Sequence, residues 1–159
     1  MKIMLFIWLV ITSLFGQETA LPSALNAWKS LSYVNAATSA EELPHASLTL
    51  NSASYIGLHN TPKVHYVTTP TNEGGTVSYG GMFQIQIKES GIYRIALGNP
   101  SWVDMIKDGK AAKSIAHQGG PQGSGIRKML DYPLESGVYI LQLSAGADST
   151  TAVMITKIK

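Results

Sequence analysis

One pentapeptide occurs twice in this chain with a single conservative change. The sequence ESGIY at residues 89–93 recurs as ESGVY at residues 135–139. Each copy stands between two segments typical of β-strands, which are residues 82–88 and 92–97 for the first copy and residues 125–134 and 138–143 for the second. A glycine turn between two such segments predicts antiparallel β-hairpins. We expect the two copies to form equivalent corners of one β-structure.

The chain from residue 46 onward is typical of a succession of short β-strands. Phe83, Ile85 and Ile87 alternate with polar residues, which indicates a strand with one buried face. Asp108-Gly109 predicts a two-residue hairpin turn, because such a turn requires positive φ angles at both positions. The expected strands are residues 47–50, 54–58, 63–68, 76–79, 82–88, 92–97, 102–107, 111–116, 125–132, 138–143 and 152–158. This pattern predicts an all-β fold, an antiparallel two-sheet sandwich of the jelly-roll type, with a closed barrel as the alternative.

Residues 17–44 differ from the rest and predict a short helical or irregular N-terminal lead-in. Ser23 is a suitable N-cap for a helix over residues 24–31, with Trp28 on its apolar side. We expect Trp28 to anchor this helix on the sandwich; an exposed contact residue is the alternative. The expected organisation is a signal peptide at residues 1–16, the lead-in at residues 17–44 and the β-sandwich domain at residues 45–159.

The first 16 residues have the pattern of a secretory signal peptide. Lys2 supplies a positive charge, residues 3–11 are an uninterrupted apolar run, and small residues precede Gln17. We expect cleavage after Gly16 and a periplasmic or secreted location; an uncleaved N-terminal anchor is the alternative. No later segment approaches the ~20 apolar residues of a membrane-spanning helix, so we expect no stable membrane span after cleavage.

Composition excludes several kinds of partner and chemistry. The 12 Lys and Arg nearly balance the 10 Asp and Glu, so a nucleic-acid surface is not indicated. The chain has no Cys, which excludes disulfides, thiolate metal ligands and a cysteine nucleophile. The four His residues lack the spacing of a metal site, and no G-x-S-x-G serine motif occurs. We therefore expect no metal and no cofactor, and assign no catalytic residue.

The most unusual stretch runs from His117 to Lys128. Four glycines in the nine residues 117–125 allow a close approach of the backbone to a ligand, and Arg127 and Lys128 follow directly. The spacing of a phosphate-binding P-loop is missing. Two interpretations stay open: a flexible connection between the sheets, with Arg127 and Lys128 on opposite faces, or a site for a small ligand.

A second candidate is the segment that contains Trp102 and Asp104. Strand alternation places these two side chains on the same face. On an exposed face, an indole beside a carboxylate suits a sugar or a cation. On a buried face, Trp102 would belong to the core and Asp104 would need a partner, for which Arg94 or Arg127 is suitable. We favour the buried or half-buried arrangement.

Four stretches carry a resemblance to known proteins: GTVSYGG at residues 75–81, GIYRIAL at residues 91–97, WVD at residues 102–104 and GIRKM at residues 125–129. They resemble a family of small exported proteobacterial proteins without an established activity, some of which carry the name homogentisate 1,2-dioxygenase. The likeness covers about residues 45–158. A dioxygenase of that name holds iron with two histidines and a glutamate in a cupin-like barrel, and this chain has no matching ligand motif. The resemblance implies the fold and the export rather than the chemistry.

The resemblance also implies which residues would form a shared site. Relatives often have a cysteine at the position of Gln122 and a His-x-His-Gly stretch where this chain has the sequence HQGG from His117. Both differences remove metal ligands or nucleophiles. Carried over position by position, the expected ligand-binding residues are Tyr79, Trp102, Asp104, His117, Arg127 and Lys128.

These observations predict an exported, non-catalytic β-sandwich domain that binds a small polar or anionic ligand or a cell-envelope component. Arg127, Lys128 and the N–H groups of the glycine-rich loop would hold the anionic part, and Trp102 or Tyr79 would provide an apolar platform. Two alternatives stay open. One is a small secreted enzyme, either a hydrolase or a metal-dependent oxygenase, and the other is a structural protein-interaction domain.

Overall fold

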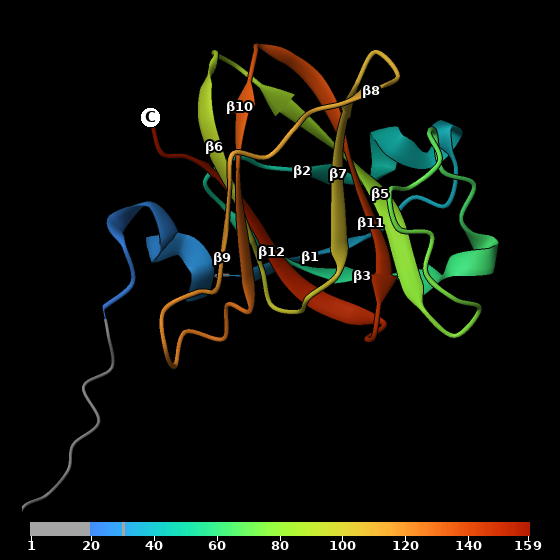
Figure 1. Ribbon diagram of the computed structural model, residues 1–159, viewed down its shortest axis with the longest axis horizontal. Coiled ribbons are helices and arrows are strands. Elements are labelled where there is room, and N and C mark those ends of the chain that lie inside the picture. Colours follow the sequence, from blue (N-terminus) through green and yellow to red (C-terminus); the bar gives the residue numbers. More distant parts are fainter. Residues whose placement is uncertain (1–19, 30) are drawn as a thin grey trace, which may run out of the picture.

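A computed structural model describes residues 20–29 and 31–159, which fold into a sandwich of two β-sheets (Figure 1). The strands are β1 (Leu31–Asn35), β2 (Ser47–Leu48), β3 (Ala53–Gly57), β4 (His59–Asn60), β5 (Tyr79–Ile87), β6 (Gly91–Leu97), β7 (Trp102–Lys107), β8 (Lys110–Ala111), β9 (Ala116–Gln118), β10 (Lys128–Leu134), β11 (Gly137–Gly146) and β12 (Thr150–Lys157). Three short 3₁₀-helices are η1 (Ser23–Lys29), η2 (Ala40–His45) and η3 (Thr61–Lys63). Sheet A has the order β1-β3-β12-β6-β10-β9, and sheet B has the order β2-β5-β11-β7-β8 with β4 beside β5.

The strand order gives the sandwich its jelly-roll topology. Successive strands largely alternate between the sheets, so β5 of sheet B is followed by β6 of sheet A and β7 of sheet B. The central units β3-β12-β6-β10 and β5-β11-β7-β8 are antiparallel, whereas the flanking pairs β1 with β3 and β2 with β5 are parallel. The predicted all-β, two-sheet sandwich is therefore confirmed.

Both copies of the repeated pentapeptide form corners between the sheets, and the prediction of hairpins there is wrong. The first copy leads from β5 to β6 and the second from β10 to β11, so each joins strands of different sheets. In each copy the tyrosine reaches back to the glutamate four residues earlier. Tyr93 Oη donates a hydrogen bond to Glu89 O at 2.7 Å, and Glu135 N donates one to Tyr139 Oη at 3.1 Å. Both tyrosine rings are buried, so each corner closes on the core.

The two corners have similar side-chain contacts, although their tyrosine hydrogen bonds run in opposite directions. In each, the glutamate pairs with a lysine of a neighbouring strand: Lys157 Nζ lies 2.9 Å from a carboxylate oxygen of Glu89, and Lys107 Nζ lies 3.7 Å from one of Glu135. The corners also touch each other through a 3.3 Å hydrogen bond between their serine residues. Both copies of the repeat therefore lie at the same end of the sandwich, in contact with each other.

The main core lies between the sheets and confirms the alternation seen in the sequence. Phe83, Ile85 and Ile87 are almost completely buried there. The predicted hairpin is also present, because Asp108 and Gly109 join β7 to β8 with φ angles of 50° and 74°. Burial of these apolar side chains supplies most of the stability of such a domain.

Several segments differ from the predicted strands. Residues 63–68 and 76–79 do not form strands of their own; apart from Tyr79, which begins β5, they belong to η3 and a long loop. Residues 111–116 are divided between β8 in sheet B and β9 in sheet A. The segment before residue 36 contains an additional strand, β1, which pairs with β3.

The first part of the predicted lead-in, residues 20–29, packs on the outer face of sheet A, whereas residues 31–35 form β1 and Leu43 belongs to the main core. The predicted helix is the 3₁₀-helix η1, which ends at Lys29 rather than at Leu31. Trp28 is buried in a second apolar cluster that includes Leu25 and Met129, which confirms its role as an anchor. Figure 1 shows η1 (blue) at the side of the sandwich, near the loop that joins β9 to β10 (orange). The predicted signal peptide lies outside the described residues, and within the described part of the chain no helix is long and apolar enough to cross a membrane.

Candidate functional site

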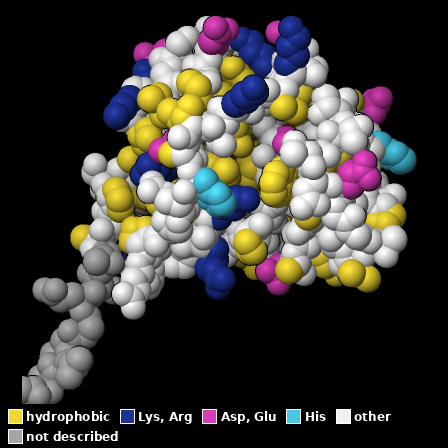
Figure 2. Space-filling model, viewed as in Figure 1, with side chains coloured by type: hydrophobic (Ala, Val, Ile, Leu, Met, Phe, Trp, Pro, Cys, Tyr) yellow, Lys and Arg dark blue, Asp and Glu magenta, His cyan; other side chains and the backbone are white. Residues whose placement is uncertain are grey.

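A cavity of about 490 Å³ opens where β7 of sheet B faces β9 and β10 of sheet A. Its volume is within the range of small-molecule sites. Four of the predicted site residues line it, namely Trp102, Asp104, His117 and Lys128. The other lining residues are Thr71, Val103, Ala112, Lys113, Ser114, Leu130 and Tyr132. Figure 2 shows a histidine and basic side chains beside hydrophobic ones on this face, between the positions of β9 and β7 in Figure 1.

The cavity exists because one edge of β7 is only partly covered by another strand. Lys128 Nζ donates a hydrogen bond to Ser101 O at 2.9 Å, and Tyr132 Oη donates one to Val103 O at 3.3 Å. The next carbonyl along this edge, that of Met105, accepts a backbone N–H at 2.8 Å. Side chains of β10 thus take the place of a neighbouring strand for the carbonyl groups of Ser101, just before β7, and of Val103 in β7. This arrangement leaves an open space at this edge of β7, which is lined by Thr71, Trp102 and Asp104 on one side and by residues of β10 on the other.

Lys128 places a buried ammonium group in this cavity. The residue is only 8% exposed, and burial lowers the pKa of its side chain below the ordinary value. Its Nζ lies 5.4 Å from the centroid of the Trp102 ring, a distance that allows a cation–π interaction. Among the described residues no carboxylate pairs with it. The positive charge of Lys128 is therefore not neutralised by the protein around it.

Asp104 places a buried carboxylate in the same cavity. It is 7% exposed and accepts two hydrogen bonds from Thr71, from the backbone N–H to Oδ2 at 2.9 Å and from Oγ1 to Oδ1 at 2.7 Å. The expected pairing with an arginine is wrong. Arg94 instead forms a bidentate pair with Asp131 at 2.7 and 2.8 Å, and Arg127 is exposed. Within residues 20–29 and 31–159, no basic side chain pairs with Asp104.

The negative charge of Asp104 contributes to raised pKa values of two nearby tyrosines. Burial first, and the negative charge of Asp104 second, raise the pKa values of Tyr66 and Tyr132 to about 12. Tyr66 uses its hydroxyl proton in a 2.8 Å hydrogen bond to Leu143 O. Both tyrosines therefore act at neutral pH as hydrogen-bond donors rather than as charged groups.

A long loop over the outer face of sheet B contributes Thr71 to the lining of the cavity. Gln142 is completely buried beneath it and forms three hydrogen bonds of 3.1 to 3.3 Å with Thr68. Ser144 Oγ donates a 2.6 Å hydrogen bond to Asn72 O. Together with the contact between Asp104 and Thr71, these bonds fix the loop to polar positions of β7 and β11. Side chains of sheet B thus form hydrogen bonds with backbone N–H and C=O groups of the loop, which has no neighbouring strand to bond them.

Two predicted site residues lie outside the cavity. Tyr79 is half-buried at the start of β5, where it packs against the main core. Arg127 is exposed, and its backbone N–H donates a 2.8 Å hydrogen bond to Leu97 O. Strand alternation separates its side chain from that of Lys128, which faces the space between the sheets. Arg127 and Lys128 therefore do not contribute to the same site.

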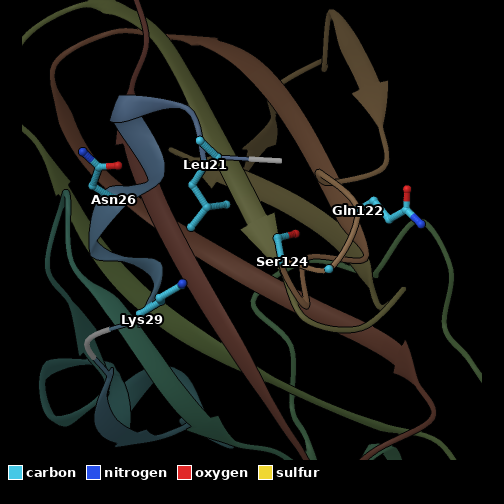
Figure 3. Close-up of a pocket in the computed structure, with 7 residues that line it drawn as sticks. Leu21, Asn26, Lys29, Gln122 and Ser124 are labelled. Carbon is cyan, nitrogen blue, oxygen red and sulfur yellow. The ribbon is translucent and has the colours of Figure 1, made fainter. Parts of the chain in front are cut away.

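The glycine-rich loop also belongs to a different surface. Gly123 and Gly125 adopt φ angles of 77° and 75°, and a Cβ atom at Gly120 would overlap the side chain of Ile126. These glycines thus have conformational and packing roles. The loop and η1 border a groove of about 470 Å³, shown in Figure 3, which is lined by Ala20, Leu21, Asn26, Lys29, Gln122, Gly123 and Ser124. Lys128 does not line this groove.

Seven lining residues of the cavity were not predicted from the sequence, and two of them, Thr71 and Tyr132, form hydrogen bonds at the site. Tyr132 follows Lys128 by four positions and therefore shares its face of β10, so alternation was a usable signal. Thr71 lies in an irregular loop far from β7 in sequence, and no local pattern connects it with Asp104. The described residues contain no group of three His, Asp or Glu side chains that could hold a metal ion.

Comparisons with known proteins do not extend this description. No protein-family model matches the chain, and no curated protein sequence matches it.

Proposed function

We propose that the protein is an exported, non-catalytic β-sandwich domain that binds a small polar or anionic ligand in the cavity between β7 and β10. The observation that carries this proposal is the buried ammonium of Lys128, which lines an open cavity without a carboxylate partner among the described residues. Burial of an unpaired charge is unfavourable, and an anionic ligand would offset this cost. Ligand-binding sites commonly contain such groups.

The surroundings of Lys128 fit an anion that carries an apolar part. One of the three N–H bonds of the ammonium is used by Ser101 O, which leaves two for a ligand. Lys113 and His117 are exposed at the rim and add positive charge or hydrogen-bond donors. Trp102 is 40% exposed and offers an apolar surface. Arg127 and the glycine-rich loop have no part in this site.

Thermal unfolding of the purified protein in the presence of phosphate, sulfate, acetate or benzoate tests the proposal. We expect at least one of these anions to raise Tm with a saturable dependence on concentration, because a ligand of the native state stabilises it. Lys128→Met should abolish this shift, whereas Lys110→Met removes an equal charge from the exposed strand β8 and should leave it intact. No shift with any of the four anions, or an equal shift in Lys128→Met, would contradict the proposal.

The export proposal rests on the first 16 residues of the sequence alone. We expect the protein recovered from a bacterial periplasm or culture medium to begin at Gln17. Intact-mass measurement checks this, and a mass that includes residues 1–16 would contradict cleavage at Gly16.

A further inference from the structure

We propose that the ligand of this cavity is a small zwitterion that places its amino group at Asp104 and its carboxylate at Lys128. This inference rests on the proposed function and adds the chemical class of the ligand. It follows from the joint arrangement of two buried and opposite charges, whereas the proposed function uses only one of them.

Asp104 and Lys128 line the same cavity but do not pair with each other. They are 7% and 8% exposed, and no ion pair or hydrogen bond joins them. Their other contacts are with neutral groups, Thr71 for the carboxylate and Ser101 O for the ammonium. Buried charges are ordinarily paired, and these two have opposite signs with a cavity beside both.

Each of the two groups has unused hydrogen-bonding capacity. A carboxylate accepts about four hydrogen bonds and an ammonium donates three. Asp104 accepts two, one on each oxygen, and Lys128 donates one. A ligand must therefore offer a donor at one end and an acceptor at the other to satisfy both groups.

Charge selects among ligands that meet this requirement. A simple anion would pair with Lys128 but would bring a second negative charge close to Asp104. A simple cation would pair with Asp104 and would be repelled by Lys128. An amino acid or another small amino carboxylate neutralises both groups and adds no net charge to the site.

The rest of the cavity suits an apolar body on such a molecule. Trp102, Val103, Ala112 and Leu130 contribute apolar surface to its lining. Trp102 is the most accessible of these large side chains, at 40% exposure. A zwitterion with an aliphatic or aromatic portion would bury this portion against the indole.

Isothermal titration calorimetry of the purified protein with matched probes tests the inference. The zwitterions are leucine, phenylalanine, β-alanine, 4-aminobutanoate and 6-aminohexanoate, which vary the spacing of the two charges. Each is compared with the analogue that lacks the amino group and with the amine that lacks the carboxylate. We expect at least one zwitterion to bind about tenfold or more tightly than both analogues, because hydrogen bonds to charged groups contribute this much.

Two variants assign the ends of the ligand. Asp104→Asn should remove the advantage of the zwitterion over its amine-free analogue, and Lys128→Met should remove its advantage over the carboxylate-free amine. Thr71→Val is the control for Asp104→Asn, because it removes the 2.7 Å bond to Oδ1 but keeps the carboxylate. It should therefore retain the zwitterion preference. The ratio of affinities is the readout, so moderate loss of stability does not affect the conclusion.

The outcomes separate this inference from the proposed function. If amine-free carboxylates bind as tightly as zwitterions and still depend on Lys128, the zwitterion inference is wrong and the anion site stands. If the zwitterion preference survives in Asp104→Asn, the assignment of the amino group to Asp104 is wrong. If neither zwitterions nor carboxylates bind, both proposals are wrong.

Discussion

The indole N–H of Trp28 donates a 3.0 Å hydrogen bond to the carbonyl oxygen of Ser124, 96 residues further along the chain. This bond joins the lead-in to the glycine-rich loop on the outer side of sheet A. It explains why the most unusual stretch of sequence is not the candidate site. The loop is fixed to η1, whereas Lys128, only four residues after Ser124, faces the cavity between the sheets.

Trp28→Phe should lower the free energy of unfolding by about 1 kcal/mol, because it removes this hydrogen bond and keeps most of the aromatic packing. Trp28→Ala should cost more, about 3–5 kcal/mol, since the residue is 7% exposed in the second apolar cluster. Urea denaturation followed by circular dichroism measures both. Anion-induced stabilisation should persist in Trp28→Phe; its loss would show that the loop contributes to the site.

Local pattern predicts the individual strands but not the sheet that each strand joins. The sequence pattern of residues 89–93, a glycine turn followed by a strand, fits a hairpin as well as a corner between sheets. The difference is decided by which partner strands are free to pair, and these lie far away in sequence. Tyr93 pairs with Tyr132 and Lys157, not with a residue of the preceding strand.

The segment from residue 63 to 68 shows why a strand-like pattern can fail. It contains alternating apolar residues, including Val64 and Tyr66, and predicts a strand. The backbone groups of Thr68 are instead bonded by the side chain of Gln142 in sheet B, and the N–H groups of Val64 and His65 are bonded by backbone carbonyls outside the sheets. Sequence pattern does not reveal that a buried glutamine of a distant strand can take the role of a backbone partner.

Sequence pattern predicted several individual residues of the candidate site, but it did not predict which of them come together in the cavity. Alternation correctly grouped Trp102 with Asp104, and in one of the two interpretations of residues 117–128 it also placed Arg127 and Lys128 on opposite faces. The expected ligand site instead used these two basic residues together. Alternation could not decide which of the two basic residues faces the cavity. That choice depends on the pairing of β10 with β6, which directs Lys128 towards the carbonyl group of Ser101.

Gln142→Leu should loosen the loop over sheet B, because it removes all three hydrogen bonds to Thr68 while it keeps the site filled. We expect a loss of about 1–3 kcal/mol of stability and faster amide exchange in residues 66–74. Hydrogen-exchange mass spectrometry measures the second effect. Gln118→Leu, on the exposed strand β9, is the matched control and should leave this exchange unchanged. Equal protection of the loop in both variants would contradict its attachment through Gln142.

Arg94 and Asp131 should show strong energetic coupling. Their two hydrogen bonds, 2.7 and 2.8 Å, join neighbouring strands on the outer face of sheet A, and their side chains are 17% and 10% exposed. Arg94→Met should cost about 1.5–3 kcal/mol, because it leaves a largely buried carboxylate without its partner. In a double-mutant cycle with Asp131→Asn, the double variant should lose less than the sum of the single losses. Additive losses would show that the pair contributes nothing beyond its separate side chains.

Anion affinity should fall as the pH rises towards 10.5, the ordinary pKa of a lysine. Burial lowers the pKa of Lys128, so this residue loses its proton, and with it its attraction for an anion, at a lower pH than an exposed lysine. The other titratable groups that line the cavity are Asp104, Lys113, His117 and Tyr132. Tyr132 stays protonated over this range, because its pKa is about 12. Calorimetric titration with benzoate between pH 8 and pH 10.5 measures the effect, since the charge of the ligand itself is constant there.

One variant and a measurement of proton uptake identify the group that titrates in this experiment. Lys113→Gln removes the other lysine that lines the cavity, so the fall in affinity should remain and should keep its midpoint below 10.5. Bound anion favours the charged form of Lys128, so protons should be taken up on binding near this midpoint. Buffers with different ionisation enthalpies detect this uptake. A fall in affinity that disappears in Lys113→Gln would assign the titration to Lys113 and would contradict the central role of Lys128 in the site.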